Sequence, residues 1–202
     1  MSKNTQEGQS EDRHLRLVVA DDEQDMRDYF ADTLPDLGHE VVAVAKTGHE
    51  LLELSRQYQP DLIITDIRMP DGDGLSAAKQ YAQERFTPVI LFTAFHDSKV
   101  LEEANDSHVF AYLVKPIDRA QLESTIAIAW QRYEQFSRLR QETNDLRQAL
   151  DDRKVIERAK GILMKERQLD EQDAFRRLQK LARDENKKLA EVARMIIIAF
   201  KA

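Results

Sequence analysis

Residues 61–66 read DLIITD, a short apolar run that ends on Thr65 and a single carboxylate, Asp66. Four more runs of this kind occur in the first 120 residues, and they cover residues 15–20, 40–44, 88–92 and 109–114. The runs are rich in Val, Ile and Leu, and most of them lack a strict alternation of apolar and polar residues. This pattern is typical of strands in a parallel sheet that helices cover on both faces.

Amphipathic stretches separate these five strands and predict helices near residues 24–36, 47–58, 74–84 and 97–106. An alternation of strand and helix implies right-handed crossovers between parallel strands. The sequence therefore predicts an α/β fold with a doubly wound, five-stranded parallel sheet. Because ligand sites in such sheets lie at the carboxyl ends of the strands, the residues that follow each run are candidates for a site.

The composition excludes several classes of protein. The chain has 202 residues, of which 42% are hydrophobic, so it can bury a core. It has no Cys, which excludes disulfides, thiolate zinc sites and a cysteine nucleophile. No apolar run approaches the roughly 20 residues needed to cross a bilayer, and residues 1–13 are polar, unlike a secretory signal. We expect a cytoplasmic protein with a disordered tail at residues 1–13.

Charged and polar side chains follow four of the predicted strands. Asp21 and Asp22 follow the first strand, Asp66 the third, Thr93 the fourth and Lys115 the fifth. All five should meet at one edge of the sheet. Two unit charges 4 Å apart repel by about 4 kcal/mol at an effective dielectric constant near 20, so three ionised carboxylates need a balancing cation.

Mg²⁺ suits such a site, because it takes a few hard oxygen ligands and keeps several waters. We expect Asp22 and Asp66 to hold the ion, with Asp21 acting through a bound water. The same arrangement suits phosphoryl transfer, with Asp66 as the nucleophile that forms an acyl phosphate. Lys115 would supply a fixed positive charge, and Thr93 a hydroxyl donor.

A long helix is predicted after the sheet, since no Gly or Pro occurs between Pro116 and Gly161. Apolar residues recur in it at spacings of three and four. The part with the alternating steps of a heptad seam consists of Phe136, Leu139, Thr143, Leu146 and Leu150. About two heptads are compatible either with a coiled-coil dimer or with a connector helix that packs on its own domain.

The last 52 residues differ from the rest in charge. Residues 1–150 carry 27 acidic and 16 basic side chains, whereas residues 151–202 carry 10 acidic and 14 basic ones. Apolar spacings in this part predict three short helices in a small bundle, with Asp170 as the N-cap of the second. Gly161 lies inside the first and suggests the close approach of another helix or a ligand. No catalytic set of residues occurs here, so an enzyme is not expected.

The first part of the chain contains four characteristic motifs within residues 14–130, namely VVADDE, ITDIRMPDGDG, LFTA and AYLVKP. Through these motifs it resembles the receiver domain of response regulators. The resemblance implies a flavodoxin-like fold, phosphorylation of Asp66 by a sensor histidine kinase, and Mg²⁺ as cofactor. It assigns the remaining roles as follows: Asp21 and Asp22 are the acidic pair, the Arg68 backbone carbonyl is a metal ligand, Thr93 and Tyr112 are switch residues, Lys115 contacts the phosphoryl group, and the Lys115–Pro116 peptide is cis.

Residues 151–202 contain three motifs in the order AKGILM, EQDAFRRL and NKKLAEVA. Through these motifs this part resembles the ANTAR domain, an RNA-binding antitermination module. The resemblance implies binding of paired RNA hairpins by their loops, which prevents a terminator from forming. The candidates for the RNA face are Lys160, Gly161, Lys165, Arg176, Arg177, Lys187 and Lys188.

We therefore expect a tail (1–13), a receiver domain (14–130), a helical linker (131–150) and an ANTAR domain (151–202). The leading hypothesis is an RNA-binding antiterminator that phosphorylation controls, through dimers that place two bundles on two hairpins. Basic residues on a three-helix unit also allow a DNA-binding regulator, and a protein-interaction adaptor is a third possibility. No membrane partner is expected.

Overall fold

The computed structural model describes residues 13–93 and 108–200 of the chain. The predicted helix near 97–106 lies outside the described residues, and so does the expected tail apart from Arg13. Contacts divide the chain into two compact units, residues 1–136 and residues 137–202.

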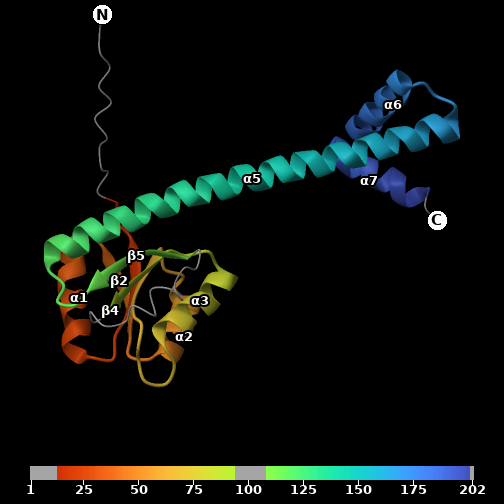
Figure 1. Cartoon of the computed structure of the whole chain (residues 1–202). Coiled ribbons are helices and arrows are strands. Elements are labelled where there is room, and N and C mark those ends of the chain that lie inside the picture. The colour runs from red at the N-terminus through yellow and green to blue at the C-terminus, as the bar shows by residue number, and fades with distance from the viewer. Residues whose placement is uncertain (1–12, 94–107, 201–202) are drawn as a thin grey trace, which may run out of the picture. The chain divides into compact units, whose positions relative to one another are not determined.

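The first unit is built on a five-stranded sheet (Figure 1). Its strands are β1 (Arg16–Ala20), β2 (Glu40–Ala45), β3 (Leu62–Asp66), β4 (Val89–Thr93) and β5 (Val109–Val114). All paired strands are parallel, and their order is β2-β1-β3-β4-β5. The predicted doubly wound sheet is confirmed, and each strand lies within one residue of the run that predicted it. This strand order places the switch point, where ligands bind, between β1 and β3.

Helices cover both faces of the sheet, as the continuous apolar runs predicted. Helices α1 (Gln24–Asp36) and α5 (Arg119–Arg167) bury Phe30, Leu34, Leu122 and Ile126 against one face. The other face is covered by α2 (Gly48–Tyr58) and α3 (Gly74–Glu84), which bury apolar side chains of their own. Each fully buried Leu, Ile or Phe contributes about 1.5–3 kcal/mol. The two cores therefore hold the strand ends in fixed positions.

Glycines let two loops approach each other at the carboxyl end of the sheet. The Gly48 backbone N–H donates to the Gly72 carbonyl at 3.1 Å, and a Cβ at Gly48 would lie 2.4 Å from that oxygen. A Cβ at Gly74 would lie 2.0 Å from the Asp66 carbonyl oxygen and 2.2 Å from Thr65 Oγ1. No side chain fits at these distances, so the loop after β3 can fold back over the end of its strand only with glycine there.

The second unit contains the C-terminal part of α5 together with α6 (Glu171–Asp184) and α7 (Leu189–Ala199). Ala159 and Leu163 of α5 pack against Ala174 and Leu178 of α6, and against Val192, Ala193 and Ile196 of α7. The three-helix bundle is therefore confirmed. The prediction that its first helix is a separate element was wrong, because α5 continues unbroken through 49 residues. No Pro occurs within these residues.

Two details of the second unit refine the sequence analysis. The Asp170 side chain accepts a hydrogen bond from the Asp173 N–H at 2.7 Å, so the predicted N-cap of α6 is confirmed. Gly161 is exposed, and nothing described lies within 4 Å of the position of its Cβ. The close approach of another helix to Gly161, which was one of two expectations, is therefore wrong for the described part of the chain.

The heptad seam divides between the two units. Phe136 stacks on Phe86 in the first unit, with ring centroids 5.4 Å apart. Leu139, Leu146 and Leu150 are instead exposed, at 67%, 67% and 59%. The alternative of a connector helix packed on its own domain does not describe these three leucines. None of the described helices has a stretch that is long and apolar enough to cross a membrane.

Two glycine substitutions should have opposite effects on stability. We expect Gly74→Ala to lower the free energy of unfolding of the first unit by about 1–3 kcal/mol, because the new methyl group collides with backbone. Gly161→Ala is the matched control and should raise helix stability by up to about 1 kcal/mol, since open space surrounds that position. Urea unfolding of both variants measures the two effects, and equal effects of the same sign would contradict this account.

Candidate functional site

Three carboxylates meet at the switch point between β1 and β3. Asp21 follows β1 and is fully buried, Asp66 is the last residue of β3, and Asp22 is exposed. One carboxylate oxygen from each lies within 4.8 Å of the others. The structure therefore brings together the three aspartates that the sequence placed at strand ends.

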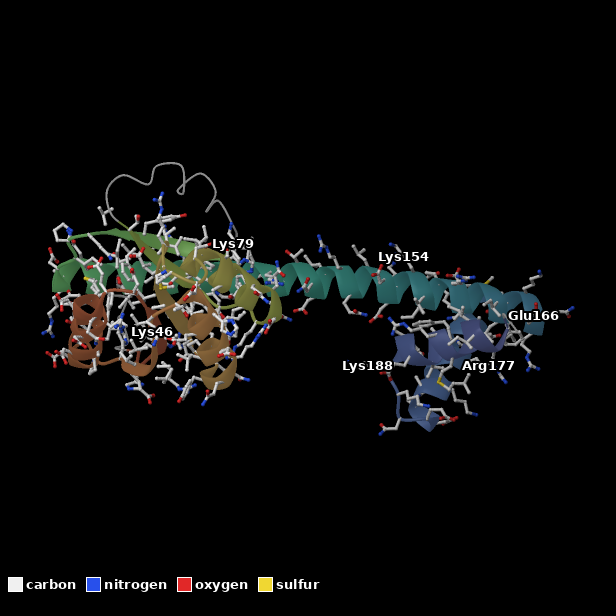
Figure 2. The ribbon with its side chains drawn as sticks, turned by 90° about the horizontal axis from the view of Figure 1, so that it is seen from below. Lys46, Lys79, Lys154, Glu166, Arg177 and Lys188 are labelled. Carbon is white, nitrogen blue, oxygen red and sulfur yellow. The ribbon has the colours of Figure 1, made fainter. Side chains whose placement is uncertain are left out.

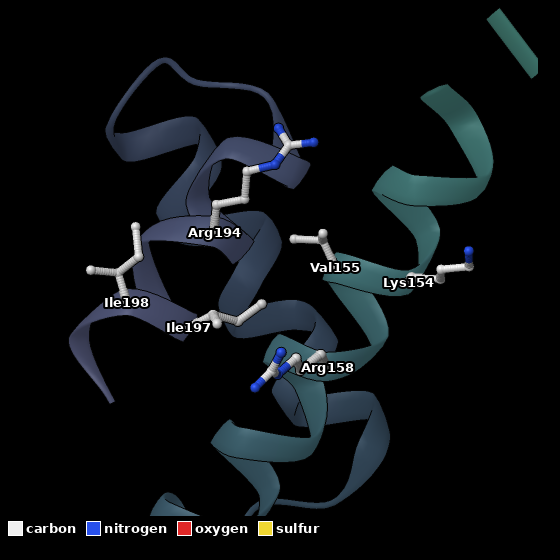
Figure 3. Close-up of a pocket in the computed structure, with 6 residues that line it drawn as sticks. All are labelled: Lys154, Val155, Arg158, Arg194, Ile197 and Ile198. Atoms are coloured by element: carbon white, nitrogen blue, oxygen red, sulfur yellow. The ribbon is translucent and has the colours of Figure 1, made fainter. Parts of the chain in front are cut away.

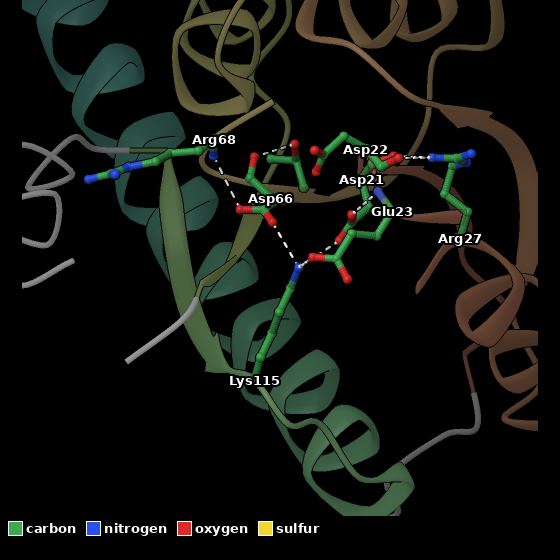
Figure 4. Close-up of polar contacts among 8 residues, drawn as sticks. Asp21, Asp22, Glu23, Arg27, Asp66, Arg68 and Lys115 are labelled. Carbon is green, nitrogen blue, oxygen red and sulfur yellow. Dashed lines mark hydrogen bonds and ion pairs between the residues drawn. The ribbon is translucent and has the colours of Figure 1, made fainter. Parts of the chain in front are cut away.

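Lys115, which directly follows β5, lies among these carboxylates (Figure 4). Its Nζ donates to Asp66 Oδ2 at 2.9 Å and to Asp21 Oδ2 at 3.0 Å, and it also contacts Glu23 Oε1 at 3.4 Å. The same ammonium lies 5.1 Å from the centroid of the Phe92 ring. The predicted cis peptide between Lys115 and Pro116 is confirmed.

The site shifts the pKa values of two of its members. Burial raises the pKa of Asp21, against the hydrogen bonds from the Glu23 N–H and from Lys115, which lower it. Burial lowers the pKa of Lys115, but its hydrogen bonds to Asp66 and Asp21 outweigh that effect and raise the pKa well above its usual value. Lys115 therefore stays a cation throughout the physiological pH range.

Backbone groups and Arg27 hold the acidic residues in place. Asp21 Oδ1 accepts a hydrogen bond from the Glu23 N–H at 2.7 Å, and Asp66 Oδ1 accepts one from the Arg68 N–H at 3.2 Å. Arg27 Nη1 donates to the carbonyl oxygens of both Asp21 and Asp22 at 2.7 Å. The Arg27 guanidinium therefore fixes the backbone from which two of the three carboxylates project.

The sequence analysis missed Glu23 and Arg27. Glu23 directly follows the acidic pair, so it could have been added to the group around Lys115. Arg27 carried a weaker signal, because it lies one turn inside α1 and acts on backbone oxygens rather than on a side chain. Only the folded loop shows that its side chain turns back toward the strand end.

The structure also locates the two expected switch residues. Thr93 is the last residue of β4, where its side chain is buried and its carbonyl oxygen accepts a hydrogen bond from the Lys115 N–H at 2.9 Å. Tyr112 lies on β5, is half-buried and packs against the core beneath α2 and α3. Burial raises the pKa of its hydroxyl.

The donor set suits Mg²⁺. Three carboxylate oxygens lie close enough to share one ion, they come from two adjacent strand ends, and the exposure of Asp22 leaves room for retained waters. Among the described residues no His takes part, and the chain has no Cys, which disfavours a softer metal. Asp21, Asp22 and Asp66 are thus the described residues that could hold the ion.

The candidate RNA face divides into exposed and buried members. Lys165 on α5, Arg176 and Arg177 on α6, and Lys187 and Lys188 before α7 are all exposed, as Figure 2 shows for Arg177 and Lys188. Arg176 contacts Asp173 at 3.4 Å and Lys187 contacts Glu185 at 3.4 Å. Such exposed pairs are weak, and a polyanion can replace them.

Lys160 is different, because it is buried in the second unit. Its Nζ donates to Glu171 at 2.7 Å and to Glu157 at 3.0 Å, and it lies 5.8 Å from the Phe175 ring centroid. The hydrogen bonds to Glu171 and Glu157 raise the pKa of Lys160, and the bond from Lys160 lowers the pKa of Glu171. Lys160 therefore links α5 to α6, and its charge is already paired.

Arg27→Gln tests how the acidic pair is positioned. Removal of the guanidinium frees the carbonyl groups of Asp21 and Asp22, and we expect Mg²⁺ affinity to fall by about tenfold or more, as for other residues that orient metal ligands. Calorimetric titration of the whole chain with Mg²⁺ measures this. Arg56→Gln removes an arginine that pairs with Glu84 on α3, and should leave the affinity unchanged. Equal affinities of the Arg27 variant and wild type would contradict the assignment.

The Lys160–Glu171 pair should make the second unit sensitive to acid. The hydrogen bond from Lys160 lowers the pKa of Glu171 in the folded state below 4.5, its usual value. The stabilisation that this pair gives to the second unit is therefore complete above pH 4.5, and it is lost as the pH falls through the lower pKa of the folded state. Glu171→Gln should therefore weaken the hydrogen-exchange protection of α6 at pH 7, and the difference from wild type should disappear in strong acid.

The matched control is Glu166→Gln, because Glu166 is exposed and makes no ion pair with the residues that the structure describes. It should match wild type at both pH values. A difference for Glu171→Gln that persists unchanged in acid would show that lost packing, rather than the ion pair, is responsible.

Comparisons with known proteins agree with this geometry. A family model for the response regulator receiver domain matches residues 17–127, and one for the ANTAR domain matches residues 144–197. The transcriptional regulatory protein PdtaR of Mycobacterium tuberculosis is 36% identical over 182 residues, which cover 90% of this chain and 89% of PdtaR.

Two solved structures are similar to the first unit. The receiver domain of the putative response regulator NarL from Mycobacterium tuberculosis has a TM-score of 0.52 at 28% identity, covering 56% of this chain and 94% of that one. A response regulator receiver domain protein from Clostridium thermocellum has a TM-score of 0.55 at 26% identity, covering 60% of this chain and 98% of that one. This chain therefore belongs to the response regulators of two-component systems, with a receiver domain followed by an ANTAR domain.

Proposed function

We propose that the chain is a phosphorylation-controlled regulator of transcription that acts in the cytoplasm. A sensor histidine kinase phosphorylates Asp66, and the ANTAR domain then binds RNA hairpins and causes antitermination. The observation that carries the proposal is the contact of Lys115 with both Asp66 and Asp21 beside the exposed Asp22. The description of PdtaR as a transcriptional regulatory protein supports an output on transcription.

The geometry around Asp66 suits nucleophilic attack on phosphorus. An Asp66 carboxylate oxygen attacks the phosphoryl group of a phosphohistidine, the P–N bond breaks, and the kinase imidazole leaves with its electron pair. Lys115 neutralises charge on the phosphoryl oxygens, while the Arg68 N–H holds the other carboxylate oxygen. Mg²⁺, when held by Asp21, Asp22, Asp66 and the Arg68 carbonyl, would add further charge neutralisation. The chain acts on no other substrate and is not an enzyme in the ordinary sense.

The signal leaves the site through Thr93, Tyr112 and Lys115. A phosphoryl group adds a charge of about −1.5 to −2, which draws the Thr93 hydroxyl and the Lys115 ammonium toward it. Tyr112, which is half-buried on the adjacent strand, then turns inward. The chain runs directly from Lys115 into α5, which begins four residues later, so a change at Lys115 acts on this helix.

Dimers place two ANTAR domains on paired hairpins. The supporting observation is the row of exposed Leu139, Leu146 and Leu150 at heptad spacing on α5. Association of two such helices would remove these side chains from water. The linker of residues 131–150 thus serves as the proposed dimer contact, and the bundle of residues 151–202 serves as the proposed RNA module.

Phosphorylation is tested with acetyl phosphate and Mg²⁺. Wild-type protein should gain the mass of one phosphoryl group, located on the peptide that contains Asp66, because this carboxylate is the only one held by both Lys115 and the Arg68 N–H among the described residues. Asp66→Asn should gain none. A phosphoryl group on another residue of wild type would contradict the assignment of Asp66.

The output is tested by crosslinking the same two proteins to RNA and sequencing the bound fragments. Phosphorylation should raise the affinity for the recovered hairpins by about 5- to 150-fold and increase the dimer fraction in sedimentation, as expected for a coupling of 1–3 kcal/mol. Duplex DNA at the same salt concentration should bind more weakly. Hairpin binding that Asp66→Asn leaves fully inducible would contradict the control mechanism, and tighter binding of DNA would favour the DNA-binding alternative.

A further inference from the structure

A groove lies at the surface between α5 and α7 in the second unit (Figure 3). It has a volume of about 350 Å³ and is lined by Lys154, Val155, Arg158, Arg194, Ile197 and Ile198. Three of these side chains are cationic, three are aliphatic, and none is acidic. The groove therefore combines positive charge with an apolar floor, although no residue of the candidate RNA face lines it.

Arg158 is the lining cation whose charge is not already used. Lys154 contacts Asp151 at 3.5 Å, and Arg194 Nη2 donates to Asp152 at 2.6 Å. Arg158 is exposed and makes no hydrogen bond or ion pair with any residue in the described part of the chain. A guanidinium without an acidic partner beside an apolar surface can pair with an incoming anion or a base edge.

The side chains are directed so that one ligand could touch both kinds of surface. In Figure 3, Val155 and Arg158 on α5 point toward α7, and Ile197 on α7 points back toward them, while the Lys154 ammonium points away from the groove. Ile198 is 70% exposed at its edge. The groove is thus lined by aliphatic groups, flanked by a planar cation and open to solvent.

We propose that this groove holds one unpaired nucleotide of a bound RNA, with Arg158 hydrogen-bonded to a base edge or phosphate and the base lying on Val155 and Ile197. The inference rests on the proposed RNA binding and adds a site to it. Volumes of about 300–1,000 Å³ are usual for small-ligand sites, and this groove lies at the lower end of that range, which suits a unit the size of one nucleotide. Proteins that bind RNA loops commonly hydrogen-bond to the edges of unpaired bases, which is the contact that Arg158 would make here.

The test compares two arginines on the same helix. Hairpins are selected from an RNA pool with a randomised loop, using the whole chain with and without acetyl phosphate, and the selected hairpin serves as the probe. Arg158→Gln should weaken its binding by about 10- to 100-fold, the loss expected for a base-reading arginine. Arg153→Gln removes the same charge from an exposed position outside the groove and should change the affinity less than threefold.

Two further measurements distinguish a nucleotide site from non-specific electrostatic attraction of RNA to the basic surface. Arg158→Lys keeps the charge but not the planar pair of donors, so it should restore little of the affinity. Hairpins with 4-thiouridine in the loop should crosslink to the peptides that contain residues 154–158 or 194–198. Full rescue by lysine, equal losses for both arginines, or crosslinks confined to Arg176, Arg177 and Lys165 would overturn the groove while leaving RNA binding intact.

Other outcomes concern the ligand class. If the wild-type chain selects no hairpin in either state, the proposed function fails and the groove proposal fails with it. If polyglutamate displaces the selected hairpin from wild type as well as unlabelled hairpin does, the groove takes an acidic protein segment and the nucleotide proposal is overturned.

Discussion

The ammonium group of Lys115 lies between carboxylates that come from two different strands. Asp21 follows β1 and Asp66 ends β3, and both would repel each other and Asp22 without a cation among them. At about 4 Å such a repulsion costs about 4 kcal/mol per pair near a protein surface. The charge of Lys115 therefore offsets the repulsion between the buried Asp21 and the partly buried Asp66.

The positions of these groups depend on backbone contacts as much as on the side chains. Gly74 lets the loop after β3 return to within contact of the Asp66 carbonyl, and Arg27 ties down the carbonyl groups of the acidic pair. Both contacts fix main chain, so the carboxylates have little freedom to separate when their charges repel.

In the second unit, two cationic side chains on the same helix differ in their contacts. Lys160 is buried between two glutamates and links two helices, whereas Arg158, two residues earlier on α5, has no described partner beside a groove. The difference arises from the helix period, since positions two residues apart face directions about 200° apart. One of these cations stabilises the bundle, and the other remains available for a ligand.

The sequence by itself determined the strands, the acidic edge, the Asp170 cap and the helices α1, α2, α3, α6 and α7, because each depends on local spacing or on the rule that parallel strands end at one edge. It also determined the family, since the motifs around Asp66 and Lys115 are specific. Tertiary structure alone decided which cations are paired. Nothing local shows that Lys160 also pairs with Glu171 of the next helix, or that Arg27 turns back to a strand end. Gly161 suggested close packing, yet open space surrounds it. Burial and partners are set by segments distant in the chain, and only their packing reveals them.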